Sequence, residues 1–392
     1  MLARILWLAL GSFAVGTETF VVAALLPSLA SDLAVTVAAA GGIVTVFALG
    51  YAIGSPVLSV LAANVERKHL LIACLVVFAL GNLAAAAAES LAGLMAARVI
   101  LAFSAGLYIP TANAVAAAVA GPHRQGRGIA IVVGGMTVAV ALGVPLGAWL
   151  AAHATWRASF VLVAIASAIA AFGLIIGLPR DLPRGTSTLR QRLEVARRPD
   201  ILRGLAVTLA FSAGVFELFT FLAPLLTGPA GLDAEGVSAV LFLFGVGAAA
   251  GNLIGGNAAD RFGALRTVRI GLAALIALFV ATAIAASAPH PLAAPAIVAL
   301  VGLWGVLGWM TYSAQMTHLV RLAPNLGSVS LSLNSSAFYV GVAGGSAIGG
   351  LLLSLGTIAD LAWFAAAMQL VALAIAGWPR RAVAPVAVAQ AD

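Results

Sequence analysis

Residues 5–29 read ILWLALGSFAVGTETFVVAALLPSL, an apolar run in which one carboxylate, Glu18, lies near the middle. A helix needs about 20 predominantly apolar residues to cross the hydrocarbon core of a bilayer, and this run supplies them. A carboxylate at that depth is costly, so such residues are rare and are usually tied to transport or proton relay. The stretch therefore predicts a transmembrane helix that carries a functional group near mid-membrane.

Composition extends this prediction to the whole chain. Of its 392 residues, 63% are hydrophobic and 8% are charged, whereas soluble globular proteins have about 45–50% apolar and about 25% charged residues. Apolar runs of spanning length recur along the chain, which predicts an all-α integral membrane protein with twelve transmembrane helices. The expected spans are 5–29, 36–62, 69–88, 91–119, 128–152, 157–178, 202–228, 235–259, 267–288, 293–319, 327–353 and 357–378.

The longest connection between these spans divides them into two groups of six. It is rich in arginine and covers 179–201. We therefore expect an N-terminal six-helix bundle over 1–178, a cytoplasmic linker over 179–201, and a C-terminal six-helix bundle with a short tail over 202–392.

Loop charges predict the orientation. Nearly all of the 20 lysines and arginines lie in one set of alternate loops, in the linker and near the two termini. Positive charge is retained on the cytoplasmic side, so both termini and the linker are expected there. The opposite loops carry the acids Asp32, Glu89, Asp233, Glu235 and Asp360.

The two halves also resemble each other in sequence. One constant offset aligns Ala-Gly-Pro at 120–122 with Leu-Ala-Pro at 322–324, and Asn113 with Gln315. Such internal repeats are typical of secondary transporters, whose substrate and ion sites lie at the interface between the repeats. The fold class expected is therefore two pseudo-symmetric six-helix bundles.

Three ionisable residues inside predicted spans are the candidates for proton coupling: Glu18, Arg98 and Glu217. Burial disfavours a charged carboxylate, which suits a group that takes up and releases a proton as water access alternates. Glu217 lies about half a chain length after Glu18. Its role stays open between proton coupling, contact with a cationic or hydroxylated substrate, and packing. Arg98 is the candidate positive partner of a carboxylate in the cavity.

Two motifs resemble those of the major facilitator superfamily. The stretch 256–263, GNAADRFG, followed by Arg266, resembles the superfamily's signature between helices 8 and 9. The stretch 143–147, GVPLG, resembles the helix-5 motif of antiporters, although Val144 splits its usual Gly-Pro pair. In the corresponding signature of the first half, Ala63 stands where an aspartate is expected.

Within that superfamily, the chain is most similar to the bacterial drug:proton antiporter branch. That branch includes the chloramphenicol-resistance and the arabinose/sugar-efflux permeases. The stretches that carry the resemblance include 16–20 (GTETF), 50–56 (GYAIGSP) and 220–224 (TFLAP). The resemblance implies a multi-pass protein of the bacterial cytoplasmic (inner) membrane, which needs a proton gradient and no cofactor, and which works as a monomer.

The signature residues at helix junctions are expected to act as gates that form contacts in one conformation only, with the carboxylate capping a neighbouring helix. These are Arg67, Lys68, Asp260, Arg261, Gly263 and Arg266. Small residues let helices approach closely, and a proline adds a kink. The residues expected in this packing role are Gly143, Pro145, Gly147, Gly345 and Gly349.

Polar and aromatic residues within the spans are the candidates for the substrate site, because ligand sites are mostly apolar with a few placed polar groups. They are Tyr108, Asn113, Phe216, Phe219, Trp309, Tyr312, Gln315 and Asn334. The set suits an amphiphilic or aromatic solute.

Other function classes find little support in the chain. There is no Gly-rich phosphate loop for ATP, no His/Cys cluster with metal-ligand spacing, and no basic run interleaved with aromatics for nucleic acid. The leading hypothesis is not an enzyme but a proton-coupled efflux transporter for a small organic solute such as a drug, working by alternating access. A sugar or nucleoside exporter and an uptake symporter remain as alternatives.

Overall fold

The computed structural model describes residues 2–62, 64–121, 124–179, 197–288, 293–323 and 327–377. Within these ranges, twelve helices are long and apolar enough to cross a membrane, so the predicted all-α fold with twelve spans is confirmed. Helix ends differ from the predicted ends by only a few residues. The linker residues 180–196, the tail 378–392 and Ala63 lie outside the described residues, so the proposed domain boundaries stay a prediction.

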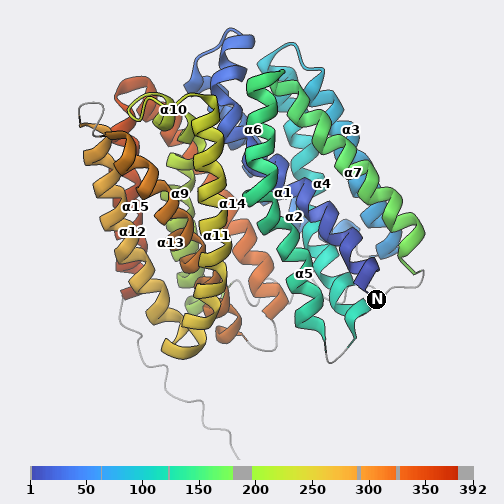
Figure 1. Ribbon diagram of the computed structural model, residues 1–392. Coiled ribbons are helices and arrows are strands. Elements are labelled where there is room, and N and C mark those ends of the chain that lie inside the picture. The colour runs from blue at the N-terminus through green and yellow to red at the C-terminus, as the bar shows by residue number, and fades with distance from the viewer. Residues whose placement is uncertain are drawn as a thin grey trace, which may run out of the picture.

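The first six spans are coloured blue to green in Figure 1. They are α1 (Leu2–Asp32), α2 (Val37–Leu61), α3 (Arg67–Ala86), α4 (Leu91–Ala120), the unit α5–η1–α6 (Gln125–Val138, Ala139–Gly143, Val144–His153) and α7 (Trp156–Gly177). Within this bundle α3 packs against α7, α2 against α4 and α1 against both α5 and α7, and α2 also packs along a helix of the second bundle.

The second six spans form a bundle beside the first, coloured yellow-green to red in Figure 1. They are α9 (Pro199–Thr220) with α10 (Leu222–Thr227), α11 (Ala234–Phe262), α12 (Ala264–Ala286), α13 (Ala293–Leu322), α14 (Gly327–Leu355) and α15 (Ile358–Gly377). Here α11 packs against α13, α9 against α14, and α12 against α15.

Two of the spans are not single regular helices, which the sequence-based ranges 128–152 and 202–228 did not anticipate. The fifth span passes through one π-helical turn, η1, immediately before Pro145. The seventh span breaks at Phe221, three residues before Pro224. Proline has no N–H for the helical hydrogen bond and its ring clashes with the carbonyl four residues earlier, so the chain rearranges near Pro145 and Pro224.

The two ends of the molecule differ in charge and in how the helices begin. We call the end at which α1 finishes and α2, α4 and α11 start the acidic end, and the opposite end the basic end. At the acidic end, Thr36, Ser90 and Asp233 cap these three helices through hydrogen bonds to backbone N–H groups. Each cap satisfies a donor that would otherwise lack a partner at the membrane surface.

The two bundles contact each other most extensively along α2 and α14, where Gly350 lies beside Ala38. Towards the acidic end α6 and η1 also pack against α11, and α10 packs against α1, whereas α5, on the basic side of the same span, has few contacts with α11. Gly245 of α11 lies so close to η1 that a Cβ there would overlap the backbone of Ala141. At the acidic end itself, His153 Nε2 lies 3.9 Å from Glu235 Oε1. The space between the bundles is therefore closed on the acidic side.

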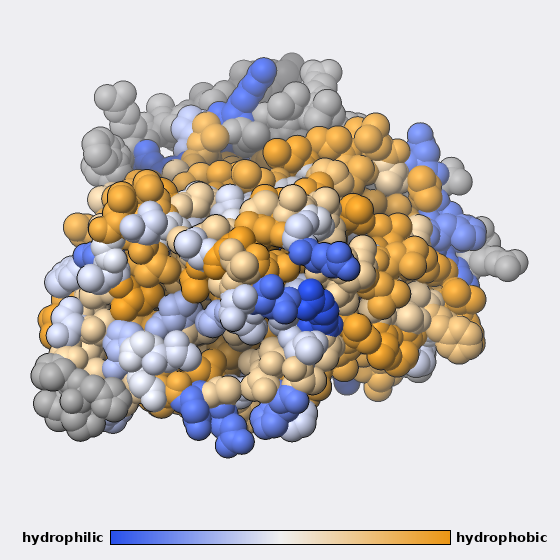
Figure 2. All heavy atoms as spheres, turned by 90° about the horizontal axis from the view of Figure 1, so that it is seen from above, coloured by the Kyte–Doolittle hydropathy of each residue, from blue (hydrophilic) through white to orange (hydrophobic). Residues whose placement is uncertain are grey.

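The outer surface is apolar around the bundles. Exposed leucine, isoleucine and valine side chains occur on nearly every long helix, including Leu253, Ile176 and Leu370. Figure 2 looks onto the acidic end and shows hydrophilic residues on that face beside large hydrophobic areas towards its margin. Helices with apolar outer faces and polar ends are what a bilayer requires. The protein is a multi-pass membrane protein.

Candidate functional site

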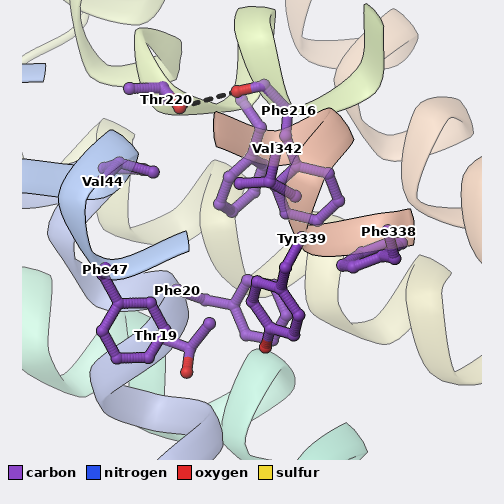
Figure 3. A pocket seen from close by; sticks show the side chains of 11 residues that line it. Thr19, Phe20, Val44, Phe47, Phe216, Thr220, Phe338, Tyr339 and Val342 are labelled. Atoms are coloured by element: carbon purple, nitrogen blue, oxygen red, sulfur yellow. Dashed lines mark hydrogen bonds between the residues drawn. The ribbon is translucent and has the colours of Figure 1, made fainter. Parts of the chain in front are cut away.

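Two internal spaces lie between the two bundles and adjoin each other. The first cavity is lined by residues of α1, α2, α9 and α14 (Figure 3). The second is lined chiefly by residues of α1, α9, α11, α13 and α14. Phe20, Phe216, Phe219 and Phe338 line both cavities. Their position between the halves is where a transporter built from two repeats holds its substrate.

Aromatic rings make up most of this wall. Phe20 reaches from the first half and lies 6.0 Å, ring centroid to centroid, from both Phe216 and Phe219 of the second half. Phe338 lies 5.1 Å from Phe216 and 4.9 Å from Tyr312. Several of these pairs are edge-to-face or tilted, the arrangement that the quadrupoles of aromatic rings favour. The cavity is therefore bounded by a set of mutually supporting rings.

Few polar groups face the first cavity, and they are hydroxyls. Thr19 Oγ1 donates to the Val15 carbonyl at 2.8 Å, and Thr220 Oγ1 donates to the Phe216 carbonyl at 2.6 Å. The third is Tyr339 of α14, whose ring stacks on Tyr51 of α2 with centroids 3.8 Å apart. That stack joins the two halves across the cavity wall.

A buried ion pair lies directly behind this wall. Arg98 Nη1 of α4 bonds Glu18 Oε1 of α1, and both side chains are fully buried. The Arg98 guanidinium carbon is 4.2 Å from the ring centroid of Phe47, and Nε donates to the Ile43 carbonyl at 3.4 Å. Phe47 and Thr19, the neighbour of Glu18 in the chain, both line the first cavity. Arg98 does not extend to the membrane surface.

The ion pair leaves one polar atom of each residue without a hydrogen bond. Glu18 Oε2 and Arg98 Nη2 are buried and have no hydrogen-bond partner among the described residues. An ion pair in a medium of low dielectric constant needs nearly every polar atom satisfied to offset the cost of desolvation. The pairing thus offsets only part of the desolvation cost of the two side chains.

Glu217 occupies a different environment. It is fully buried on α9, and neither carboxylate oxygen has a partner among the described residues. A Cβ added to Gly349 of α14 would contact its Cγ, so the side chain lies in the seam between α9 and α14. It lines neither cavity. The two glutamates, similar in sequence position, are not equivalent in structure.

Four of the eight predicted substrate residues meet at the cavities, namely Phe216, Phe219, Trp309 and Tyr312. The other four lie elsewhere. Gln315 Nε2 donates to the Gly204 carbonyl at 2.7 Å and to Thr208 Oγ1 at 3.2 Å, and Thr208 Oγ1 donates to Asn334 Oδ1 at 2.6 Å. Gln315 and Asn334 therefore belong to a buried network that joins α9, α13 and α14.

The remaining two predicted substrate residues lie on α4. Tyr108 donates its hydroxyl to the Leu8 carbonyl of α1 at 2.9 Å, which ties two helices of the first half together. Asn113 is partly buried, and its side-chain oxygen has no partner among the described residues. Neither residue lines a cavity.

The predicted gate residues of the second half lie at the junction of α11 and α12. Asp260 belongs to the last turn of α11 and accepts a hydrogen bond of 2.7 Å from Arg321 of α13, instead of capping a helix. The helix continues past Asp260 because Gly263, with φ of 90°, is the residue that ends it. Arg261 and Arg266 are exposed at the same junction.

In the first half, Lys68 donates to the carbonyls of Ile175 and Leu178 at 2.9 and 2.6 Å, at the end of α7. Arg67, beside it, is partly buried.

The predicted packing glycines lie where helices approach closely. A Cβ at Gly143 would overlap Thr17 of α1, and one at Gly345 would overlap the Ala213 carbonyl of α9. Gly147 and Gly349 face the same two helices in the same way. Pro145 lies in the first turn of α6, two residues after the π-helical turn at which the fifth span departs from regular α-helix.

Sequence reasoning missed several wall residues. Phe47, Phe338, Tyr339 and Trp304 line the cavities but were not selected. The available signal was the occurrence of several aromatics in the second and eleventh spans, which are mostly small or aliphatic. No periodicity distinguishes an aromatic that faces the other bundle from one that faces lipid.

Comparisons with known proteins agree with this architecture. A sequence profile described as Major Facilitator Superfamily matches residues 8–346. The chloramphenicol resistance protein of Streptomyces lividans is 33% identical over 96% of this chain and 95% of its own length. The inner membrane transport protein YdhP of Escherichia coli K12 is 31% identical over 90% of this chain and 89% of its own.

The fold is also shared with solved structures. The crystal structure of a mutant of the nucleoside transporter NupG has a TM-score of 0.77 at 12% identity, covering 95% of this chain and 98% of that chain. Twelve membrane helices in two bundles, a cavity between them and a profile match over most of the length lead to one conclusion. The chain belongs to the major facilitator superfamily and is a membrane transporter.

Proposed function

We propose that this transporter is a proton-coupled antiporter that exports a small organic solute by alternating access. The observation that carries the proposal is the fully buried Glu18–Arg98 ion pair directly behind the wall of the cavity between the halves. Ionisable residues inside a membrane protein mark substrate or proton pathways because their position is so costly. The similarity to a chloramphenicol resistance protein supports export of a drug-like solute.

The geometry suggests how a proton and a solute act on the same equilibrium. While Glu18 is ionised, it balances the charge of Arg98. A proton that reaches Glu18 removes the balancing charge and leaves a buried cation, which raises the free energy of that conformation. A solute in the cavity touches Thr19 and Phe47, which adjoin both partners. Each ligand therefore biases the two conformations through the same side chains.

Transport in reconstituted vesicles tests the coupling. Purified protein in proteoliposomes should move radiolabelled chloramphenicol against its gradient when a pH gradient is imposed, in the direction opposite to proton flow. Glu18→Gln should lose this gradient-driven movement, since glutamine cannot exchange a proton. Glu89→Gln, the same change at an exposed position of the acidic end, should respond to the gradient as the wild type does.

Two results would contradict the proposal. One is accumulation by Glu18→Gln at the wild-type rate under the same gradient. The other is movement of the solute in the same direction as the protons, which would identify an uptake symporter. Transport of labelled arabinose in place of chloramphenicol would favour the sugar exporter.

We further propose that the basic end faces the bacterial cytoplasm, with both termini on that side, and that the monomer is the working unit. The excess of lysine and arginine at the basic end supports the orientation. The presence of both bundles and the cavity in one chain supports the monomer. In this orientation, the conformation described here is closed towards the outside.

A further inference from the structure

We propose that the cavities bind an uncharged aromatic amphiphile. Its ring lies among Phe216, Phe219 and Phe338, and its polar end lies at the hydroxyls of Thr19 and Tyr339. This assignment rests on the proposed function for the direction and driving force of transport. The binding claim itself is independent of either.

The ring follows from the shape and chemistry of the second cavity. Its wall contains nine aromatic residues, together with two valines and a glycine: Phe20, Phe211, Phe216, Phe219, Phe244, Trp304, Trp309, Tyr312, Phe338, Val140, Val215 and Gly308. Faces and edges of rings are both presented, as in the edge-on contact of Phe219 with Trp304 at 6.2 Å. An aromatic guest can therefore repeat the offset and edge-to-face contacts that the wall residues already make with each other.

One buried polar atom in this wall suggests that the aromatic ring of the solute carries a hydrogen-bond acceptor. The indole Nε1 of Trp304 is buried and has no hydrogen-bond partner among the described residues. A buried donor without a partner carries the full cost of its lost hydration. A ring substituent that accepts a hydrogen bond, such as a nitro or carbonyl group, would relieve that cost.

Charge decides against a cationic solute. No residue that lines either cavity is an acid, a lysine or an arginine. Glu18 is balanced by Arg98, and Glu217 lies in the α9–α14 seam outside both linings. A cation bound among these rings would gain cation–π attraction but would find no free counter-charge to offset its desolvation.

Hydrogen-bonding capacity decides against a sugar. Thr19 Oγ1 donates to the Val15 carbonyl, so it offers a solute only an acceptor site. Thr220 Oγ1 bonds both the Phe216 carbonyl and Ser346 Oγ, so it is already paired twice. A polyol in this wall would leave most of its hydroxyl groups unpaired, and each buried hydroxyl without a partner disfavours binding.

The orientation follows from where the hydroxyls lie. Figure 3 shows the hydroxyl groups of Tyr339 and Thr19 on the same side of the first cavity. A solute with one polar end can satisfy its donors there while its ring occupies the second cavity. The polar end then lies beside the Glu18–Arg98 pair.

Binding to the purified wild-type protein in detergent tests the class of solute without any gradient. The probes are radiolabelled chloramphenicol, which is uncharged, aromatic and hydroxylated, tetraphenylphosphonium, which is aromatic and cationic, and L-arabinose, which is neither. We expect saturable binding of chloramphenicol, with the other two at least about tenfold weaker. Absence of saturable chloramphenicol binding, or equal or tighter binding of either other probe, would overturn the assignment.

Matched variants test the position. Phe338→Leu keeps apolar bulk but removes a ring that lines both cavities, and should weaken chloramphenicol binding by about tenfold. Phe172→Leu makes the same change on the outer face of α7, where Phe172 is 64% exposed, and should leave binding unchanged. Equal affinity of the two variants would overturn the assignment.

A second pair of variants tests the role of the Trp304 indole N–H as a hydrogen-bond donor. Trp304→Phe keeps a ring and removes the indole N–H, so chloramphenicol should bind several-fold more weakly. Trp363→Phe, on the outer face of α15, should bind as the wild type does. Binding by Trp304→Phe at wild-type affinity would overturn the role of the donor.

Failure of this inference and failure of the proposed function are distinguishable. Selective chloramphenicol binding without gradient-driven movement would leave the inference standing and remove the antiport. Gradient-driven export of tetraphenylphosphonium or arabinose, without chloramphenicol binding, would leave the antiport standing and overturn the inference about the solute.

Discussion

At the scale of single residues, Glu18 and Arg98 are two charged side chains that do not reach solvent. The charge of each is therefore stabilised by the charge of the other. Among the described residues, the guanidinium contacts the carboxylate, the Ile43 carbonyl and the face of Phe47. Removing one charge leaves the other uncompensated at low dielectric constant, which costs more than removing both. The pair is thus a strong determinant of which conformation is stable.

A double-mutant cycle measures this dependence. Glu18→Gln and Arg98→Gln should each lower the free energy of unfolding by about 3–5 kcal/mol, and the double variant by less than the sum of the two. Thermal or denaturant unfolding of the purified variants in one detergent gives all four corners. Additive losses would mean that the two charges do not interact in solution.

At the scale of elements, the same devices occur once in each half. Lys68, near the start of α3, donates to carbonyls at the end of α7, and Arg269, near the start of α12, donates to the Ala376 carbonyl at the end of α15. Glycines bring α5–η1–α6 onto α1 and α14 onto α9 in the same way. The repeat visible in the sequence is therefore a repeat of helix contacts.

The capping contact can be tested on α15. Arg269→Met should make the amides of the last turn of α15 exchange with deuterium about two- to fivefold faster, because a cation at a helix C-terminus contributes about 0.3–1 kcal/mol. Arg266→Met removes an exposed arginine from the same helix and serves as the control. Unchanged exchange in Arg269→Met would argue that the carbonyls are satisfied without it.

Two neighbouring glycines provide a matched test of close packing. A Cβ at Gly345 would overlap the Ala213 carbonyl, whereas nothing lies within 4 Å of a Cβ at Gly344. Gly345→Ala should lose about 1–3 kcal/mol of stability through overpacking. Gly344→Ala should be neutral or gain up to about 1 kcal/mol from helix propensity. Unfolding curves of the two proteins make the comparison, and equal midpoints would contradict the packing.

At the scale of the whole molecule, the contact between the halves decides which side of the membrane the cavity faces. Gly245 permits α11 to touch η1 at Ala141, beside Val140 and Phe244 in the wall of the second cavity. A larger side chain there would hold the halves apart without entering either bundle's interior, so both bundles should remain folded.

Gly245→Leu should therefore expose the cavity to the acidic end. In a Cys74→Ala background, Val44→Cys places a single thiol in the wall of the first cavity. An impermeant maleimide added on the side of the acidic end should label this thiol faster when Gly245→Leu is also present. Equal labelling rates would mean that this crossing does not close the cavity.

Much of the scaffold could be read from residue types alone. Runs such as 5–29 predicted each span to within a few residues, because a predominantly apolar helix of that length has few stable environments other than a bilayer. Glu18 and Arg98 stood out for the same reason. Tyr108, Gln315 and Asn334 were selected as wall residues but join helices instead, because a polar residue in a membrane helix is equally suited to either role.

The sequence by itself determined the membrane spans, the twofold plan of six and six, and the positions where charge is buried, because each follows from local composition and spacing. Only the tertiary structure decided that Glu18 pairs with Arg98 while Glu217 has no hydrogen-bond partner among the described residues. It alone gathered Phe20, Phe338 and Trp304 into one wall. The reason is geometric: which side chains meet depends on how helices rotate and cross, and this is fixed by packing between residues far apart in the chain.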